Sequence, residues 1–98
     1  MRPLTAEHIR KNSKPHPTAS MRGGDARMYR EEIGDYILSI VGGGQGLYGD
    51  FVNTFEVALI DATTGDFVTG VYSQRGDDVL GWADIDEINS IYYNIPRK

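Results

Sequence analysis

The chain has 98 residues, a length that corresponds to one domain and excludes two stacked domains or a full doubly wound nucleotide-binding fold. The sequence contains no cysteine, which excludes disulfide frameworks, thiolate metal sites and cysteine nucleophiles. The net charge of −4 is unevenly distributed: residues 1–30 carry seven basic and two acidic side chains (+5), and residues 31–98 carry three basic and twelve acidic ones (−9). Such asymmetry bears on long-range attraction and on the choice of partner rather than on fold.

Residues 1–26 are predicted to form a basic, mobile N-terminal arm. A short helix with Thr5 as its N-cap is compatible with residues 5–12, but it has few apolar side chains to bury and is marginal alone. The following segment, residues 14–24, contains two prolines and adjacent glycines, which disfavour both helix and sheet. Residues 27–98 are therefore expected to form the single compact domain, which is acidic.

The first elements of this domain are predicted to be a helix and a strand. Residues 26–33 are compatible with a short helix that has Asp25 as N-cap, an Arg27–Glu31 pair one turn apart, and Gly34 at its end. Residues 36–41 have the β-branched and aromatic content of a strand. The glycines that follow must end that strand.

A β-hairpin is predicted next. Apolar side chains alternate with mixed ones from residue 54 to residue 60, which is the period of a strand with one buried face. The turn at residues 62–66 leads into a second strand over residues 67–72, and Gly65 can adopt the positive φ that such a turn requires.

The C-terminal segment has the period of an amphipathic helix. Asp84 is its predicted N-cap, Glu87 completes a capping box, and Pro96 ends the helix. The apolar side chains recur every three or four residues, at Ile85, Ile88, Ile91, Tyr92 and Ile95. The fold class expected is α+β, with a small antiparallel meander of three or four strands and this helix packed across one face.

Residues 44–49, GQGLYG, match the G-x-G-x-x-G pattern of dinucleotide-binding turns. Such a turn must open a helix whose N-terminal amides face the phosphate, whereas the residues that follow alternate like a strand. A glycine-rich β connection is therefore favoured over nucleotide binding, and no cofactor is expected.

Acidic residues gather in a loop and at the start of the C-terminal helix. They are compatible with a hard-metal site or an acid–base pair, or with carboxylates that oppose the helix dipole as a solvated rim. The spacing lacks the ligand order of an EF-hand loop, so the rim is favoured and no metal is expected. No convergent trio of catalytic groups can be named, and a small enzyme is the least favoured function.

Aromatic side chains lie among these acids, and protein interfaces use such rings as anchors. For Trp82 the alternative, equally favoured, is that its ring is a buried staple that fixes the helix to the sheet. The residues predicted to bind a partner are Tyr48, Asp50, Phe51, Asp77, Asp78, Trp82, Asp84, Asp86, Glu87 and Tyr93.

The segments SIVGGGQGLYGDFVNTFEVALID and DDVLGW resemble small uncharacterised accessory proteins of tailed bacteriophages. The resemblance covers about residues 36–93 and omits the basic arm. It implies a strand, a glycine-rich connection, a second strand, a turn and a final helix. It also implies a protein that binds a host protein in the host cytoplasm, with no known catalytic residue.

The leading hypothesis is a non-enzymatic protein-binding module that inhibits or modulates a host protein with a basic or nucleic-acid-binding surface. Mimicry of DNA by the carboxylates is its sharper form. The alternative is a nucleic-acid-binding or assembly protein that acts through its arm. A homo-oligomer is compatible with either, and no membrane association is expected. The arm residues that would contact phosphates are Arg2, Arg10, Lys11, Lys14 and Arg22.

Overall fold

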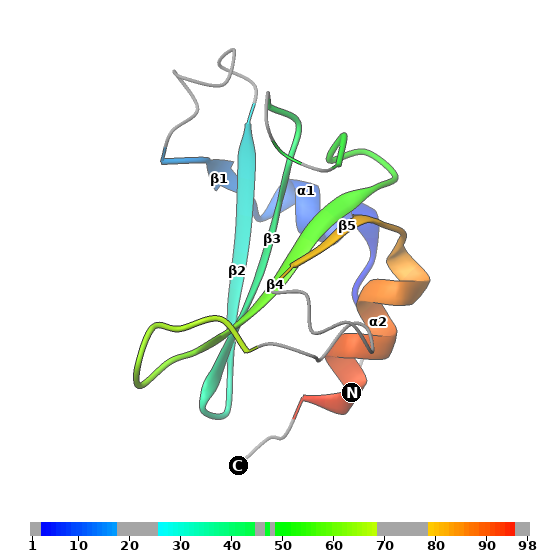
Figure 1. The fold of residues 1–98 in the computed structure, drawn as a ribbon. Helices are drawn as coiled ribbons and strands as arrows, with labels where there is room; N and C mark the ends of the chain where they lie inside the picture. The colour runs from blue at the N-terminus through cyan, green and yellow to red at the C-terminus, as the bar shows by residue number, and fades with distance from the viewer. Residues whose placement is uncertain (1–2, 18–25, 45–46, 48, 69–78, 96–98) are drawn as a thin grey trace.

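A computed structural model describes residues 3–17, 26–44, 47, 49–68 and 79–95 (Figure 1). The strands it describes form one antiparallel sheet in the order β1-β2-β3-β4-β5, which confirms the α+β class with more strands than expected. Neither described helix is long and apolar enough to cross a membrane. The elements are α1 (Ala6–Lys11), β1 (Lys14–Pro15), β2 (Arg27–Ile33), β3 (Tyr36–Gly42), β4 (Phe55–Asp61), β5 (Val79–Ala83) and α2 (Ile85–Asn94).

Strand β2 replaces the helix predicted over residues 26–33, so that prediction was wrong. The strand pairs with β3 along its whole length, from Arg27 opposite Gly42 to Ile33 opposite Tyr36. A two-residue turn joins the strands, and its first residue, Gly34, has φ 57°, as tight antiparallel hairpins require. The expected glycine stop is thus a hairpin turn, and the cross-strand ladder outweighs the local Arg27–Glu31 pair.

Strands β3 and β4 lie where the sequence predicts strands, and they pair from Tyr36 opposite Asp61 to Val41 opposite Glu56. The turn after β4 contains Gly65 at φ 78°, as expected. Of the predicted partner strand over residues 67–72, the structure describes a single bridge between Ile60 and Phe67. Residues 69–72 lie outside the described part of the chain.

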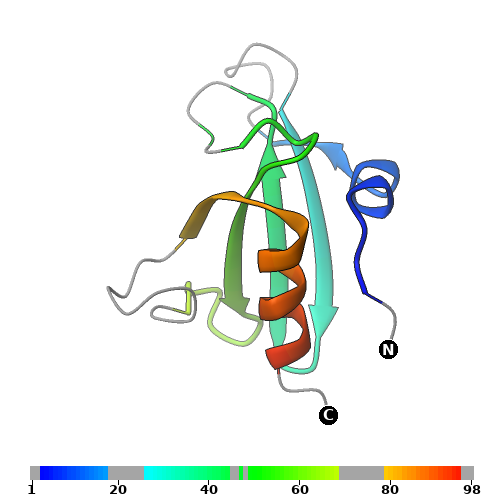
Figure 2. The ribbon, with the colours of Figure 1, turned by 90° about the vertical axis from the view of Figure 1, so that its right-hand side faces the viewer.

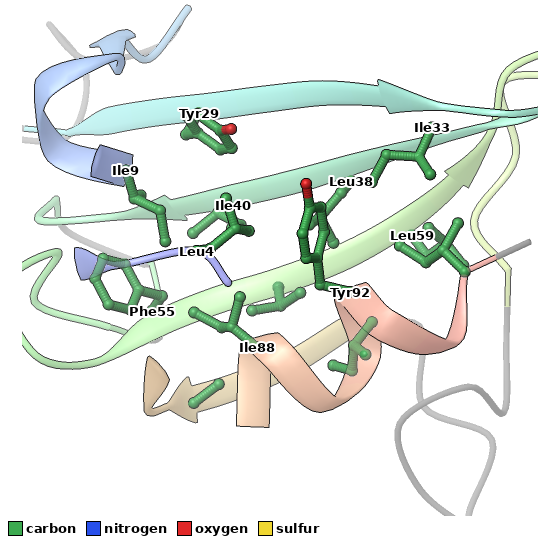
Figure 3. Close-up of a cluster of buried hydrophobic side chains, with 14 of the residues drawn as sticks. Leu4, Ile9, Tyr29, Ile33, Leu38, Ile40, Phe55, Leu59, Ile88 and Tyr92 are labelled. Carbon is green, nitrogen blue, oxygen red and sulfur yellow. The ribbon is translucent and has the colours of Figure 1, made fainter. Parts of the chain in front are cut away.

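Helix α2 packs across one face of the sheet and closes the hydrophobic core (Figures 2 and 3). The helix begins as predicted, because Asp84 and Glu87 form a complete capping box. Helix α1, the four strands β2 to β5 and helix α2 all contribute side chains to this core. Its largest fully buried side chains are Ile9, Leu38, Ile40, Phe55, Val57 and Ile88.

The described part of the expected arm, residues 3–17, packs against the rest of the domain. Thr5 caps helix α1, because its hydroxyl accepts from the His8 backbone N–H, and Ile9 on this helix is 0% exposed. The backbone of Leu4 is fixed to α2, because its N–H donates to Asn89 Oδ1 (2.7 Å) and its carbonyl accepts from Asn89 Nδ2 (2.8 Å). The sequence analysis placed the start of the domain after residue 26, but Leu4 and Ile9 belong to its hydrophobic core. Residues 18–25 are not described.

Replacing Ile9 with alanine tests whether this segment is part of the cooperative fold. A buried isoleucine that becomes alanine leaves a cavity, and we expect the free energy of unfolding to fall by about 2–5 kcal/mol. Denaturant titration followed by circular dichroism measures the change. The matched control is Lys11→Ala on the exposed side of α1, which we expect to leave stability within about 0.5 kcal/mol. Equal stability of the two variants would show that residues 3–17 contribute nothing to the fold.

Candidate protein-binding site

An irregularity in β5 sets the geometry of the predicted partner-binding region. Phe55 pairs with Ala83, but Val57 pairs with Leu80, so two residues of β5 oppose the single residue between them on β4. This arrangement is a β-bulge. Leu80 packs against the core and Ala83 lies within it. Because side chains of a regular strand alternate between faces, two residues three positions apart can both face the core only if an extra residue is inserted.

Trp82 is one of the two residues in this bulge. Its φ of 56° is left-handed, a conformation that costs a residue with a Cβ atom about 1–2 kcal/mol and that is unusual for a bulky side chain. The residue is 61% exposed, so the ring is not the buried staple considered from the sequence. Bulges commonly re-aim a side chain, and this one accompanies an indole that faces solvent.

The acids that follow Trp82 are exposed and ordered by the helix start. Asp84 accepts from the Glu87 backbone N–H (2.9 Å), and Glu87 Oε1 accepts from the Asp84 backbone N–H (3.4 Å). Asp86 lies in the same first turn, and α2 has no basic residue in its last turn. The capping interpretation is thus confirmed for Asp84 and Glu87, and both residues are exposed at the surface.

Tyr93 lies on the same side of α2 as Asp86. It lies seven residues after Asp86, and two helical turns return a side chain to nearly the same direction. The residue is 47% exposed, and its ring centroid lies 6.1 Å from that of Tyr92. We name the set Trp82, Asp84, Asp86, Glu87 and Tyr93 the acidic aromatic face.

Other predicted partner-binding residues have different roles. Phe51 is only 5% exposed and packs edge-on against Phe55, with ring centroids 5.3 Å apart, so its assignment to an exposed interface was wrong. Asp50 is exposed, but it organises its own loop. Its Oδ1 accepts from the backbone N–H groups of Val52 (2.8 Å), Thr54 (3.0 Å) and Asn53 (3.0 Å), which hold the pKa of the carboxyl at about 2.

The remaining predicted residues divide between the described and the undescribed parts of the chain. Tyr48, Asp77 and Asp78, and the arm residues Arg2 and Arg22, lie outside the described residues. Lys11 and Lys14 are exposed on α1 and β1. The Arg10 guanidinium donates to the carbonyl of Val52 (2.6 Å) and so links α1 to the loop before β4.

The described residues of the glycine-rich connection after β3 lead into a bend and then into strand β4, not directly into a helix. The sequence analysis favoured such a β connection over a nucleotide-binding turn. Gly49 is required there for close packing. A Cβ atom on Gly49 would lie 2.6 Å from Phe55 Cα, a separation that side-chain carbons do not adopt.

The sequence analysis did not predict one group of polar side chains that the structure brings together. Glu31 on β2 accepts from the hydroxyl of Tyr29 (2.7 Å) with one carboxylate oxygen and from the hydroxyl of Tyr92 (2.9 Å) with the other. The Tyr29 hydroxyl also lies 3.4 Å from His8 Nε2. Burial, and then the Glu31 carboxylate, raise the pKa of Tyr29 well above its ordinary value. The titratable side chains of Tyr29, Glu31 and Tyr92 therefore converge at this point, with His8 beside them. The sequence analysis named no such convergent group.

The signal for this group was present in the sequence but hidden by the helix assignment. A strand over residues 27–33 places Tyr29, Glu31 and Ile33 on one face, so a period of two predicts a carboxylate among inward-facing side chains. Within the described ranges, no three or more His, Asp or Glu side chains are grouped so that they could hold a metal ion.

Comparisons with protein-family models, with curated proteins and with solved structures find no match to this chain. The fold and the local geometry therefore carry the functional argument.

Replacing Trp82 with glycine or with alanine measures the backbone strain at the bulge. Both variants delete the indole, but only alanine keeps the Cβ atom that disfavours positive φ. We expect the glycine variant to be more stable than the alanine variant by about 1 kcal/mol, the reverse of the usual order within strands. Thermal and denaturant unfolding of the two proteins check this order. An alanine variant as stable as the glycine variant would show that Trp82 is not strained.

Proposed function

We propose that this protein is a non-enzymatic binding module that docks on a basic surface of another protein through its acidic aromatic face. The observation that carries the proposal is Trp82, the single tryptophan of the chain, exposed to solvent from a strained bulge beside a rim of carboxylates. Strained backbone that persists in a fold is concentrated at functional sites, where the surrounding structure maintains it.

The chemistry of the face fits a protein partner. Tryptophan and tyrosine are the rings that contribute most to protein interfaces, because they bury a large area with few rotatable bonds. Carboxylates around them attract a basic surface over long distance and accelerate encounter. The net charge of −9 over residues 31–98 strengthens the attraction. Together these features favour a partner whose contact surface is positively charged.

The resemblance to accessory proteins of tailed bacteriophages supports a host protein as that partner, and inhibition or modulation as the outcome. A host protein that binds nucleic acid has a suitable basic surface. In the sharper form of the proposal, the carboxylates of Asp84, Asp86 and Glu87 occupy the place of DNA phosphates. Duplex DNA is then expected to compete with this protein for the partner.

The alternative is nucleic-acid binding or assembly through the basic N-terminal segment. Lys11 and Lys14 are exposed and available to phosphates. Arg10 is engaged with Val52, and residues 3–17 pack on an otherwise acidic domain, so this alternative has weaker support. Binding of the intact chain to random duplex DNA that withstands raised salt would favour it.

Neutralising the rim without changing its shape tests the proposal. The variant Asp84→Asn, Asp86→Asn, Glu87→Gln removes three charges, while asparagine remains a good N-cap and glutamine completes a capping box. A partner is first isolated by affinity capture from a bacterial lysate, and its Kd is then measured calorimetrically at two salt concentrations. We expect the affinity to fall by about tenfold or more and the salt dependence to decrease.

A variant with the same net charge controls for the loss of overall attraction. Glu7→Gln, Glu32→Gln and Asp66→Asn neutralise three exposed acids outside the acidic aromatic face. This control is expected to bind nearly as tightly as the original protein, and Trp82→Gly is expected to lose binding while remaining folded. Equal effects of the two triple variants would reduce the role of the face to unspecific charge, and unchanged binding in all three would refute the proposal.

A further inference from the structure

A pocket of about 370 Å³ lies on the flank of α2 that faces the N-terminal segment and β2. Figure 2 shows this flank, with the N-terminal segment beside α2 and the sheet behind them, and Figure 3 shows Tyr92 extending from α2 over the sheet. The residues that line the pocket are Pro3, Leu4, Thr5, His8, Glu31 and Tyr92. A carboxylate, an aromatic ring and a short backbone segment thus surround one cavity.

Hydrogen bonds hold the walls of this pocket in place. Asn89 on α2 pairs with both backbone polar groups of Leu4, which fixes the N-terminal segment against the helix. Thr5 caps α1 and so sets the position of His8. Because these contacts join three separate elements, the pocket is formed before any ligand enters, which lowers the entropic cost of binding.

The Glu31 carboxylate retains capacity for a positively charged ligand. Each of its oxygens accepts one tyrosine hydroxyl, from Tyr29 and from Tyr92, whereas a carboxylate offers about four acceptor positions. The tyrosines are neutral donors, so they orient the carboxylate without neutralising it. Among the described residues no lysine or arginine lines this pocket or pairs with Glu31. A partly buried carboxylate is stabilised most by a cation that also donates hydrogen bonds.

We propose that this pocket binds the ammonium or guanidinium group at the end of an extended side chain or small amine. The cation donates to the free acceptor positions of Glu31, and the ring of Tyr92 contacts its apolar stem or its charge. Neutral or anionic groups of the same size lack this charge-assisted contact and are excluded.

Two sources can supply such a group: a free amine, or a lysine or arginine side chain of a polypeptide. The second source connects the pocket with the acidic aromatic face, since Tyr92 lines the pocket and the ring of the next residue, Tyr93, lies on that face. Only this second source rests on the proposed function. The binding of a cation by the pocket is independent of it.

Amide NMR spectra of the isotope-labelled full chain test the pocket with butylammonium, with its neutral analogue butanol, and with a short oligolysine peptide. Butylammonium is expected to give saturable shifts confined to residues 3–8 and to the neighbourhood of Glu31 and Tyr92, and butanol none. Tighter, Glu31-dependent binding of the peptide identifies a polypeptide side chain as the natural ligand. Absence of saturable shifts with both cations, or equal shifts with butanol, would overturn the proposal.

Two variants make the test specific. Glu31→Gln is expected to weaken butylammonium binding by about tenfold or more, whereas Glu32→Gln, on the next residue of β2, is expected to leave it unchanged. Unchanged binding in Glu31→Gln would refute the proposal. Because Glu31→Gln also alters the contacts with Tyr29 and Tyr92, a second variant keeps the Glu31 carboxylate and removes only the contact between His8 and Tyr29.

That second variant, His8→Lys, introduces a competing ammonium at the rim of the pocket and is expected to abolish binding of the free amine. Asn12→Lys adds the same charge one turn further along α1, outside the pocket, and is expected to have little effect. Equal binding in the two variants would contradict the proposal. Failure of the pocket would leave the acidic aromatic face untouched, because Trp82→Gly and the neutralised rim test that surface separately.

Discussion

Two side chains three residues apart on β5, Leu80 and Ala83, both face the core, and the geometry of this region depends on that constraint. A regular strand cannot satisfy it, so the strand contains a bulge with one extra residue. The left-handed backbone of Trp82 and the exposure of its ring accompany that bulge. Because α2 begins directly afterwards, the exposed ring and the exposed helix-capping carboxylates lie close together in the chain. Core packing thereby determines the surface that we propose binds a partner.

The elements predicted correctly from the sequence are those whose local signals agree with one another. In α2 the apolar period, the capping box and the following proline indicate the same helix, and β3 and β4 have both strand composition and turn signals at their ends. Residues 27–33 give conflicting signals, because Tyr29 and Ile33 are four positions apart and fit either period. Pairing with β3 decides the outcome, and such non-local pairing is invisible in a local window. The same applies to residues 3–17, whose contacts with α2 lie more than eighty positions away.

Only part of the candidate site was predicted from the sequence, because local spacing is visible there and tertiary packing is not. Acids at a helix start are readable from spacing, so Asp84, Asp86 and Glu87 were located correctly at the surface. Whether an aromatic side chain is buried or exposed depends on tertiary packing, which local spacing does not show. Phe51 is buried, whereas Trp82 is exposed. Glu31 was missed because the wrong period placed it on the surface of a helix. A carboxylate at an inward position of a strand is a signal of a polar site that a correct period would have revealed.

The state of the single tryptophan with and without its partner tests the central claim most directly. Fluorine NMR of the chain labelled with fluorotryptophan reports one ring, and the difference between spectra in light and heavy water measures its contact with solvent. We expect a large isotope effect in the free protein, and we expect it to disappear when the captured partner is bound. An isotope effect that remains the same in the complex would show that Trp82 stays in water and that the partner docks elsewhere.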